Sequence, residues 1–212
     1  MMSNSRAFDR DGVPDVVVQR LPIYLRTLAF IADEHDVISS RELSSLAGVS
    51  AAQLRKDLSL FGEFGRQGLG YRIKDLIAEL ERILQVDRVW PVILVGAGPL
   101  GRAIANYRNS FETWQFQIVA AFDSDEAKVG LALGHLRVQP MRELVSTVQE
   151  GAIEIGILAI PPGAAQAVAD TLVGCGVRAI LNYASTRLVV PERVRVAYID
   201  PVVSLNGMTY YL

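Results

Sequence analysis

Three glycines near the middle of the chain have the types and spacing of a phosphate cradle. Gly96, Gly98 and Gly101 form the pattern G-x-G-x-x-G inside the stretch VGAGPLG. The first glycine of this pattern allows a tight turn, the second lets the backbone approach a pyrophosphate, and the third lets a helix pack against a strand. We therefore expect the whole turn to hold the phosphates of a dinucleotide: Gly96, Ala97, Gly98, Pro99, Leu100 and Gly101.

An acidic residue follows these glycines at the distance that a dinucleotide fold requires. Asp123 ends the apolar stretch FQIVAAFD, roughly 20 residues beyond the last glycine, where a carboxylate receives the ribose hydroxyls. It would repel the 2′-phosphate of NADP, so we expect NADH and NAD+ as the cofactors. Asp125 is the alternative, the acid of an ordinary loop or cap. The remaining predicted cofactor residues lie in the loops after the strands: Lys128, Ile160, Pro161 and Asn182. Tyr183 and Ala184, which follow Asn182, should also line the cofactor crevice.

The side chains that usually catalyse hydride transfer do not form a convincing set. Such enzymes place a histidine, a lysine or a Tyr–Lys pair against the substrate. Beyond the glycines the chain has one histidine, His135, and one lysine, Lys128. With one cysteine and two histidines, a cysteine-rich metal site is excluded. We predict no catalytic residues, no metal and no enzyme, with an NAD-dependent oxidoreductase or a CoA-ligase-like subunit as alternatives.

The elements around the glycines follow the pattern of a parallel sheet. From about residue 90, short apolar stretches alternate with amphipathic ones, as in successive βαβ units. Strands are expected directly after Pro91 and over 116–123, 136–140, 153–161 and 178–184, with a helix over 163–176. This half of the chain is predicted to be a Rossmann-type domain.

The first half predicts two short helices joined by a tight turn. Ser39 and Glu42 have capping-box spacing at a helix start, Gly48 ends that helix, and Ser50 with Gln53 begins the next. This is the helix-turn-helix arrangement, whose second helix, about 51–61, reads DNA. The residues left for its outer face are Gln53, Arg55, Lys56 and Ser59. Of these we expect Gln53, Arg55 and Lys56, together with Ser50 at the helix start, to contact DNA. The alternative is an ordinary solvated helix face.

A glycine-rich stretch, FGEFGRQGLGY, follows that helix. Its four glycines break a helix, and Phe64 and Tyr71 suggest a short β-hairpin, the wing of a winged-helix domain. From residue 50 to residue 74 the chain has five basic and two acidic side chains, although its net charge is −2. Phosphate contact is therefore expected locally. At the wing tip we expect Arg66, Gln67 and Gly68 to contact DNA.

Composition limits where such a protein would act. No apolar run approaches the roughly 20 residues that span a bilayer, so no membrane partner is expected. The first residues, MMSNSRAFDRDG, lack the apolar core of a signal peptide. A single cysteine suits a reducing compartment, and we expect a cytoplasmic protein.

Five stretches resemble the Rex family of redox-sensing transcriptional repressors. They cover 49–71, 95–107, 122–130, 157–184 and 196–212, so the resemblance extends over essentially the whole chain. It implies an α/β chain with an N-terminal winged-helix DNA-binding domain, residues 1–88, followed by a Rossmann-type parallel-sheet NAD-binding domain, residues 89–199. Residues 200–212 would form a C-terminal dimerisation helix, exchanged between subunits.

The resemblance also implies a function. Such repressors are homodimers that bind palindromic operator DNA when NADH is low and are released when NADH binds, and so sense the cellular NADH/NAD+ state. In the family an Arg–Lys pair on the recognition helix contacts DNA, which corresponds to Arg55 and Lys56. A switch set of arginine, tyrosine and aspartate corresponds to Arg20, Tyr107 and Asp200.

Overall fold

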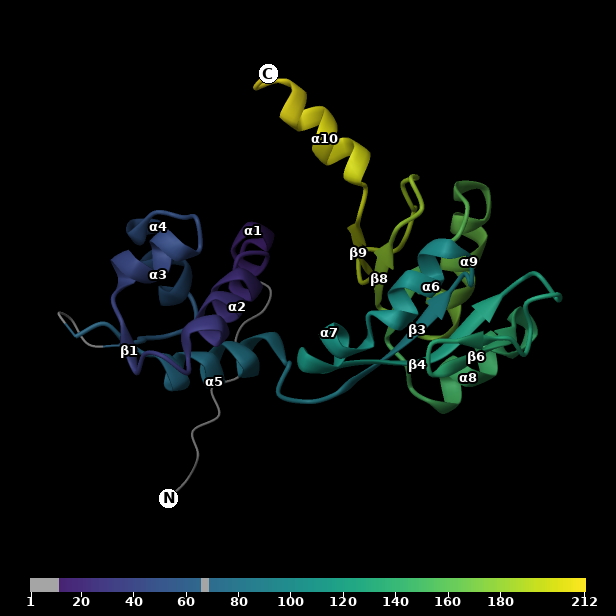
Figure 1. The fold of residues 1–212 in the computed structure, drawn as a ribbon, viewed down its shortest axis with the longest axis horizontal. Helices are drawn as coiled ribbons and strands as arrows, with labels where there is room; N and C mark the ends of the chain where they lie inside the picture. Colours follow the sequence, from purple (N-terminus) through teal and green to yellow (C-terminus); the bar gives the residue numbers. More distant parts are fainter. Residues whose placement is uncertain (1–11, 66–68) are drawn as a thin grey trace. The chain divides into compact units, whose positions relative to one another are not determined.

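The computed structural model describes residues 12–65 and 69–212 of the chain, and these form two compact units. The first unit is Met1–Arg88 and the second is Val89–Leu212 (Figure 1). The predicted wing-tip residues Arg66, Gln67 and Gly68 lie outside the described residues.

The N-terminal unit is mainly helical within its described part. Its helices are α1 (Asp15–Val18), α2 (Leu21–Ile31), α3 (Ser40–Leu46), α4 (Ala51–Ser59) and α5 (Ile73–Leu84). Two short strands, β1 (Val37–Ile38) and β2 (Tyr71–Arg72), pair antiparallel. Apolar side chains from the long helices fill the core, among them Leu21, Leu28, Leu43, Leu54 and Leu80, each fully buried.

Side-chain caps begin α3 and α4 as predicted. Ser39 accepts a hydrogen bond from the Glu42 N–H, and the Glu42 carboxylate accepts one from the Ser39 N–H, which completes the capping box. Ser50 accepts the N–H of Gln53 in the same way at the start of α4. The starts of two successive helices are thereby fixed by local hydrogen bonds.

Gly48 makes the turn between these helices. Its φ of 70° is a left-handed conformation that glycine adopts without strain. The N–H groups of Gly48 and Val49 donate to the carbonyls of Ser45 and Ser44, the two bonds of a Schellman cap. The turn therefore ends α3 and changes the direction of the chain before α4 begins. Figure 1 shows the two helices side by side.

The segment after α4 differs from the prediction in two respects. The helix ends at Ser59 rather than near residue 61, and Gly62 follows with a φ of 142°. Tyr71 pairs with Ile38 of β1 and not with a strand just before the loop. The two sides of the loop still approach closely, because a Cβ on Gly65 would lie 2.5 Å from the Gly70 carbonyl oxygen.

The C-terminal unit, fully described over 89–212, is built on a seven-stranded sheet of order β5-β6-β4-β3-β7-β8-β9. The strands are β3 (Trp90–Val95), β4 (Phe116–Asp123), β5 (Ala132–Leu133), β6 (Leu136–Pro140), β7 (Ile155–Leu158), β8 (Ala179–Asn182) and β9 (Arg195–Tyr198). All neighbouring pairs are parallel except β5 with β6. The predicted parallel sheet is confirmed. The prediction missed β5, which has only two residues, and β9, a mostly exposed strand at the edge of the sheet.

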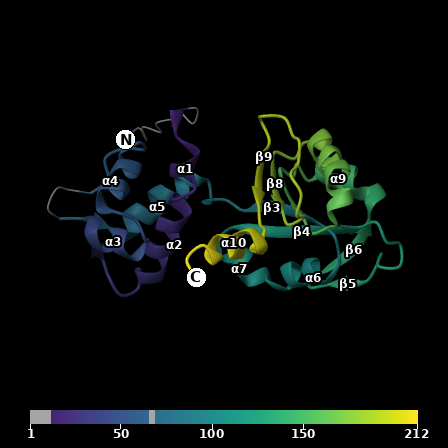
Figure 2. The same cartoon turned by 90° about the horizontal axis from the view of Figure 1, so that it is seen from above.

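Helices cover both faces of this sheet (Figure 2). Side chains of α8 (Leu144–Glu150) and α9 (Pro162–Cys175) pack with Phe122 and Ile93 on one face. Side chains of α6 (Pro99–Asn106) pack with Leu94 and Ala121 on the other. The unit also contains α7 (Arg108–Thr113) and a short 3-10 helix, Met141–Glu143. A sheet buried on both faces explains why its strands are apolar almost throughout.

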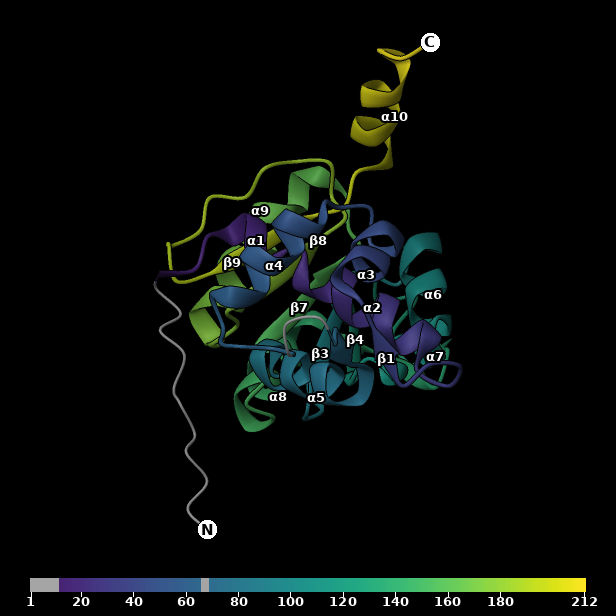
Figure 3. The same cartoon turned by 90° about the vertical axis from the view of Figure 1, so that its left-hand side faces the viewer.

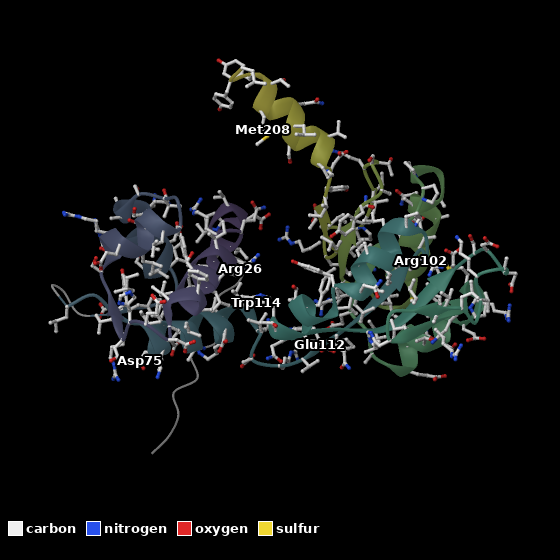
Figure 4. All side chains as sticks on the ribbon, viewed as in Figure 1. Arg26, Asp75, Arg102, Glu112, Trp114 and Met208 are labelled. Atoms are coloured by element: carbon white, nitrogen blue, oxygen red, sulfur yellow. The ribbon has the colours of Figure 1, made fainter. Side chains whose placement is uncertain are left out.

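The last helix, α10 (Pro201–Thr209), projects from the sheet and is exposed along its whole length (Figures 1 and 3). Asp200 caps it by accepting the N–H of Val202, and Pro201 occupies its first turn. Its exposed side chains are largely apolar, and Figure 4 shows that of Met208 standing out from the helix. No helix within residues 12–65 and 69–212 is both long and apolar enough to cross a membrane.

Phe122 gives a direct test of the sheet core, since its side chain has no exposed surface. Phe122→Ala should lower the free energy of unfolding of the C-terminal unit by about 3–5 kcal/mol. Urea unfolding followed by tryptophan fluorescence measures this, because both tryptophans of the chain, Trp90 and Trp114, lie in that unit. Val119→Ala in the same strand is the matched control: it is 38% exposed and should cost about 1 kcal/mol or less. Equal losses would contradict the core assignment.

Candidate functional site

The glycines of the predicted cradle make the turn between β3 and α6. Gly96 has a φ of 107°, and a Cβ there would lie 2.2 Å from the Ala159 carbonyl oxygen. A Cβ on Gly101 would lie 1.9 Å from the carbonyl oxygen of Gly96. Both positions therefore exclude a side chain because other backbone is too close. Gly98 differs, since a Cβ there would meet nothing within 4 Å.

A cavity of about 540 Å³ opens over this turn, beyond the carboxyl ends of the parallel strands. This is the place where doubly wound sheets bind ligands. The predicted cofactor residues that line it are Gly96, Gly98, Pro99, Leu100, Asp123, Lys128, Ile160 and Pro161. Tyr183, expected there because it lies in the loop that follows β8, also lines the cavity. Ser124 and Met141 line it as well and were not predicted.

Three predicted residues are placed differently. Ala97 and Gly101 are buried and shape the turn without lining the cavity. Asn182 is 1% exposed; its amide donates to the Thr186 carbonyl and accepts the N–H of Ala184. Asn182 lines a neighbouring cavity of about 870 Å³ instead, next to the start of α10.

The Asp123 carboxylate is the polar centre of the dinucleotide-type cavity. It accepts the N–H of Ala97 at 2.7 Å and that of Asp125 at 2.9 Å, and the Lys128 ammonium lies 3.0 Å away. Burial acts to raise the pKa of Asp123, but these hydrogen bonds outweigh it and hold the pKa below its ordinary value. The carboxylate is therefore ionised at neutral pH, and Lys128 partly balances its charge.

The outer face of α4 carries the predicted basic pair. Arg55 and Lys56 are both exposed, and the Arg55 guanidinium donates to the Ser40 hydroxyl at 3.0 Å. The Ser50 hydroxyl caps the helix, so its oxygen already accepts one hydrogen bond. Gln53 is only half-buried and lies in the first turn, beside the N-terminus of the helix.

The inner face of α4 holds a charged group that the sequence reasoning did not place there. Asp57 is one of the two acidic side chains between residues 50 and 74, yet it has no exposed surface. Its carboxylate accepts two hydrogen bonds from the Arg20 guanidinium, at 2.6 and 2.8 Å, and one from the Tyr24 hydroxyl at 2.7 Å. Helical spacing does place Asp57 on the face of Leu54 and Leu58, but it gives no signal for the partners of the carboxylate, because Arg20 and Tyr24 lie at the start of α2 and on it.

The three residues predicted as a switch lie in both units. Arg20 belongs to the N-terminal unit, where Asp57 binds it. Tyr107 follows α6, is 65% exposed and contacts Phe111 edge to face at 6.4 Å. Asp200 caps α10 and lines the larger cavity.

Comparisons with known proteins match this two-part architecture. Residues 12–59 match the family model "Putative DNA-binding protein N-terminus", and residues 87–186 match the model "CoA binding domain". The redox-sensing transcriptional repressor Rex of Chloroflexus aggregans is 51% identical over 204 residues, which cover 95% of each chain. The chain belongs to the Rex family. The Rex of Streptomyces coelicolor is 40% identical over 94% of this chain and 78% of its own.

Solved structures of a Rex-family repressor agree with this assignment. RSP in complex with beta-NAD+ and operator DNA superposes with a TM-score of 0.88 at 40% identity, over 94% of this chain and 92% of that one. RSP in complex with beta-NADH gives 0.84 at 37% identity, over 94% of each. The predicted family and fold class are confirmed, and the similar Rex proteins are named as regulators rather than as enzymes.

The Tyr24–Asp57 contact generates a prediction about alkaline pH. Burial, and then the hydrogen bond to Asp57, raise the pKa of Tyr24 to about 12. Because the folded protein holds this proton more tightly than the unfolded chain, the contribution is complete below about pH 10 and is lost as the pH rises towards 12. Tyr24→Phe should cost about 1–3 kcal/mol at neutral pH, since it leaves a buried acceptor unpaired.

Urea unfolding followed by circular dichroism, at pH 7 to 11.5, measures both effects. The difference between wild type and Tyr24→Phe should shrink above about pH 10. A difference that stays constant over that range would contradict the raised pKa.

The glycine turn gives a matched pair of variants. Gly101→Ala should lower the melting temperature of the C-terminal unit strongly, because the new methyl group would overlap the Gly96 backbone. Gly98→Ala meets open space and should change the melting temperature little. Calorimetry of the two proteins decides this, and equal shifts would contradict the packing described for the turn.

Proposed function

We propose that this Rex-family protein represses transcription in response to the NADH/NAD+ state. It binds palindromic operator DNA when NADH is low and leaves it when NADH binds. The observation that carries the proposal is the combination, in one chain, of a capped helix-turn-helix with a glycine turn and acid of dinucleotide type. RSP has been crystallised with beta-NAD+ and operator DNA and with beta-NADH, which supports each half of the proposal.

The dinucleotide would lie in the cavity over the β3–α6 turn. Gly98 leaves room for a pyrophosphate against the backbone, and α6 directs its N-terminus there. Asp123 would receive the ribose hydroxyls, with Lys128 beside it. Pro161 and Ile160 would form the wall on the β7 side, and Asn182 would hold the β8 loop in place through its two backbone contacts.

Operator DNA would be bound by α4 and the following loop. Arg55 and Lys56 would contact phosphates or bases, while Ser50 and Gln53 at the helix start would face the major groove. Arg66, Gln67 and Gly68 are proposed to enter or follow the groove at the tip of that loop.

A homodimer is proposed from the exposure of α10. Soluble monomers rarely leave so apolar a helix uncovered. Its exposed apolar side chains are Val202, Val203, Leu205, Met208, Tyr210 and Tyr211. A second copy of the chain, with α10 exchanged, would cover them and would match a palindrome's two-fold symmetry.

The proposed domain limits follow from the separate roles of DNA binding, dinucleotide binding and dimerisation. We propose residues 1–88 as the DNA-binding domain, 89–199 as the NAD(H)-binding domain and 200–212 as the dimerisation helix. Tyr107 and Asp200 would respond to the reduced nicotinamide; Arg20 would join them only by leaving Asp57. The site of action is proposed to be the cytoplasm, where operator DNA and the NADH pool meet.

A gel-shift experiment tests the function directly. A palindromic duplex selected from a random library should bind the protein and should be released by NADH but not by an equal concentration of NAD+. Gly98→Ala should still bind the duplex, but NADH should release it at least about tenfold less effectively, because the methyl group would occupy the place of the pyrophosphate.

Arg55→Ala should weaken binding to the duplex. The slope of log affinity against log salt concentration should become shallower by about one released ion.

Two outcomes would contradict the proposal. One is a wild-type protein that selects no duplex. The other is a bound duplex whose occupancy is the same with and without NADH, which would favour a DNA-binding protein that responds to another ligand. Turnover of NADH with a small substrate would favour the oxidoreductase alternative.

A further inference from the structure

The buried Asp57 carboxylate has four hydrogen bonds, and one of them comes from a residue of the outer face. Oδ2 accepts from Arg20 Nε at 2.6 Å and from the Tyr24 hydroxyl at 2.7 Å. Oδ1 accepts from Arg20 Nη2 at 2.8 Å and from Gln53 Nε2 at 2.7 Å. Arg20 and Tyr24 use the carboxylate to fix α4 against α2. Gln53 is the only one of these partners that lies on α4 itself.

This contact settles which way round the Gln53 amide lies. A carboxylate is an acceptor only, so the amide must present its NH₂ group and not its oxygen. Burial acts to raise the pKa of Asp57, but hydrogen bonds from Arg20, Tyr24 and Gln53 outweigh it and keep the pKa below its ordinary value. Asp57 therefore stays ionised at neutral pH, and the Gln53 amide is held in one orientation.

The groups that remain on Gln53 match one base. With one N–H given to Asp57, the amide keeps its Oε1 acceptor and its second N–H donor. In the major groove adenine offers the complementary pair, the N6 amino group and the N7 acceptor, and a glutamine amide recognises both. Guanine offers two acceptors, O6 and N7, so its O6 would face the Oε1 of a glutamine that cannot turn over.

The position of Gln53 allows such a contact. It is the third residue of α4, and the N-terminal residues of a recognition helix approach base edges. Its side chain is half-buried, so it joins the buried network to the outer face.

We propose that Gln53 selects adenine over guanine at one base pair of each operator half-site, and that Asp57 is the positioning residue that fixes its amide for this purpose. This inference rests on the proposed operator binding. It also gives Arg20 a role at the DNA-binding surface, because Arg20 binds Asp57 and so helps to fix the carboxylate that orients Gln53.

The test replaces single adenines of the selected operator, in both half-sites, by guanine or by purine, which lacks the N6 amino group. At one adenine, wild type should lose about fivefold to a hundredfold in affinity with guanine, the usual cost of one mismatched base pair. With purine it should lose about fivefold. Gln53→Ala and Gln53→Met should show less than about a twofold change at that adenine and the wild-type pattern elsewhere.

Two further variants separate base selection from general weakening. Lys56→Ala should lower affinity for every duplex by a similar factor and leave the adenine preference intact. Asp57→Asn should reduce the adenine preference at the same base pair, because a neutral amide can also donate to Gln53 and no longer fixes its orientation. Circular dichroism checks that Asp57→Asn is folded; if it is not, the two Gln53 variants decide alone.

The inference is overturned if Gln53→Ala discriminates at every adenine as wild type does. It is also overturned if purine is tolerated by wild type at all positions. A wild-type protein that binds no duplex would overturn the proposed function itself, and this is seen before any variant is made.

Discussion

The C-terminal unit depends on close backbone packing at the turn between β3 and α6, where two glycines lie against neighbouring carbonyl groups. The Gly96 and Gly101 backbones leave no space for a Cβ, since carbonyl oxygens lie within 2.2 Å of where it would be. This contact draws α6 onto the end of the sheet and sets the floor of the cavity. Everything else in the C-terminal unit that bears on a ligand, including the Asp123 carboxylate and the loop after β7, is arranged around that floor. Gly98 is free of such contacts, which separates its part in ligand binding from the packing of the turn.

The N-terminal unit depends on a polar contact of comparable rigidity. Placing the Asp57 carboxylate in the core would be costly without partners, and four hydrogen bonds remove that cost. Such a group contributes less to net stability than an apolar residue would, but it admits only one geometry. That property suits a helix whose outer residues must meet base pairs in a fixed register.

In each unit, a buried carboxylate that accepts several hydrogen bonds from the protein lies at the edge of the surface that would meet a ligand. Asp123 is held by two backbone N–H groups and Lys128, and Asp57 by three side chains. In each case the carboxylate remains ionised, so its orientation and charge do not depend on the ligand. The exposed apolar side chains of α10 are the contrasting feature.

The sequence alone determined the elements that rest on local chemistry. Serine caps, a positive-φ glycine and the G-x-G-x-x-G turn all act over a few residues, so the helix-turn-helix, the order of strand, turn and helix, and Asp123 could be read directly. Only the tertiary structure decided what depends on residues far apart in the chain. Asp57 shares the helix face of Leu54 and Leu58, but whether a carboxylate can be buried there depends on its partners Arg20 and Tyr24, which lie more than 30 residues away in the chain. For the same reason Asn182 was predicted beside the cofactor but holds its own loop, whereas its neighbour Tyr183 lines the cavity.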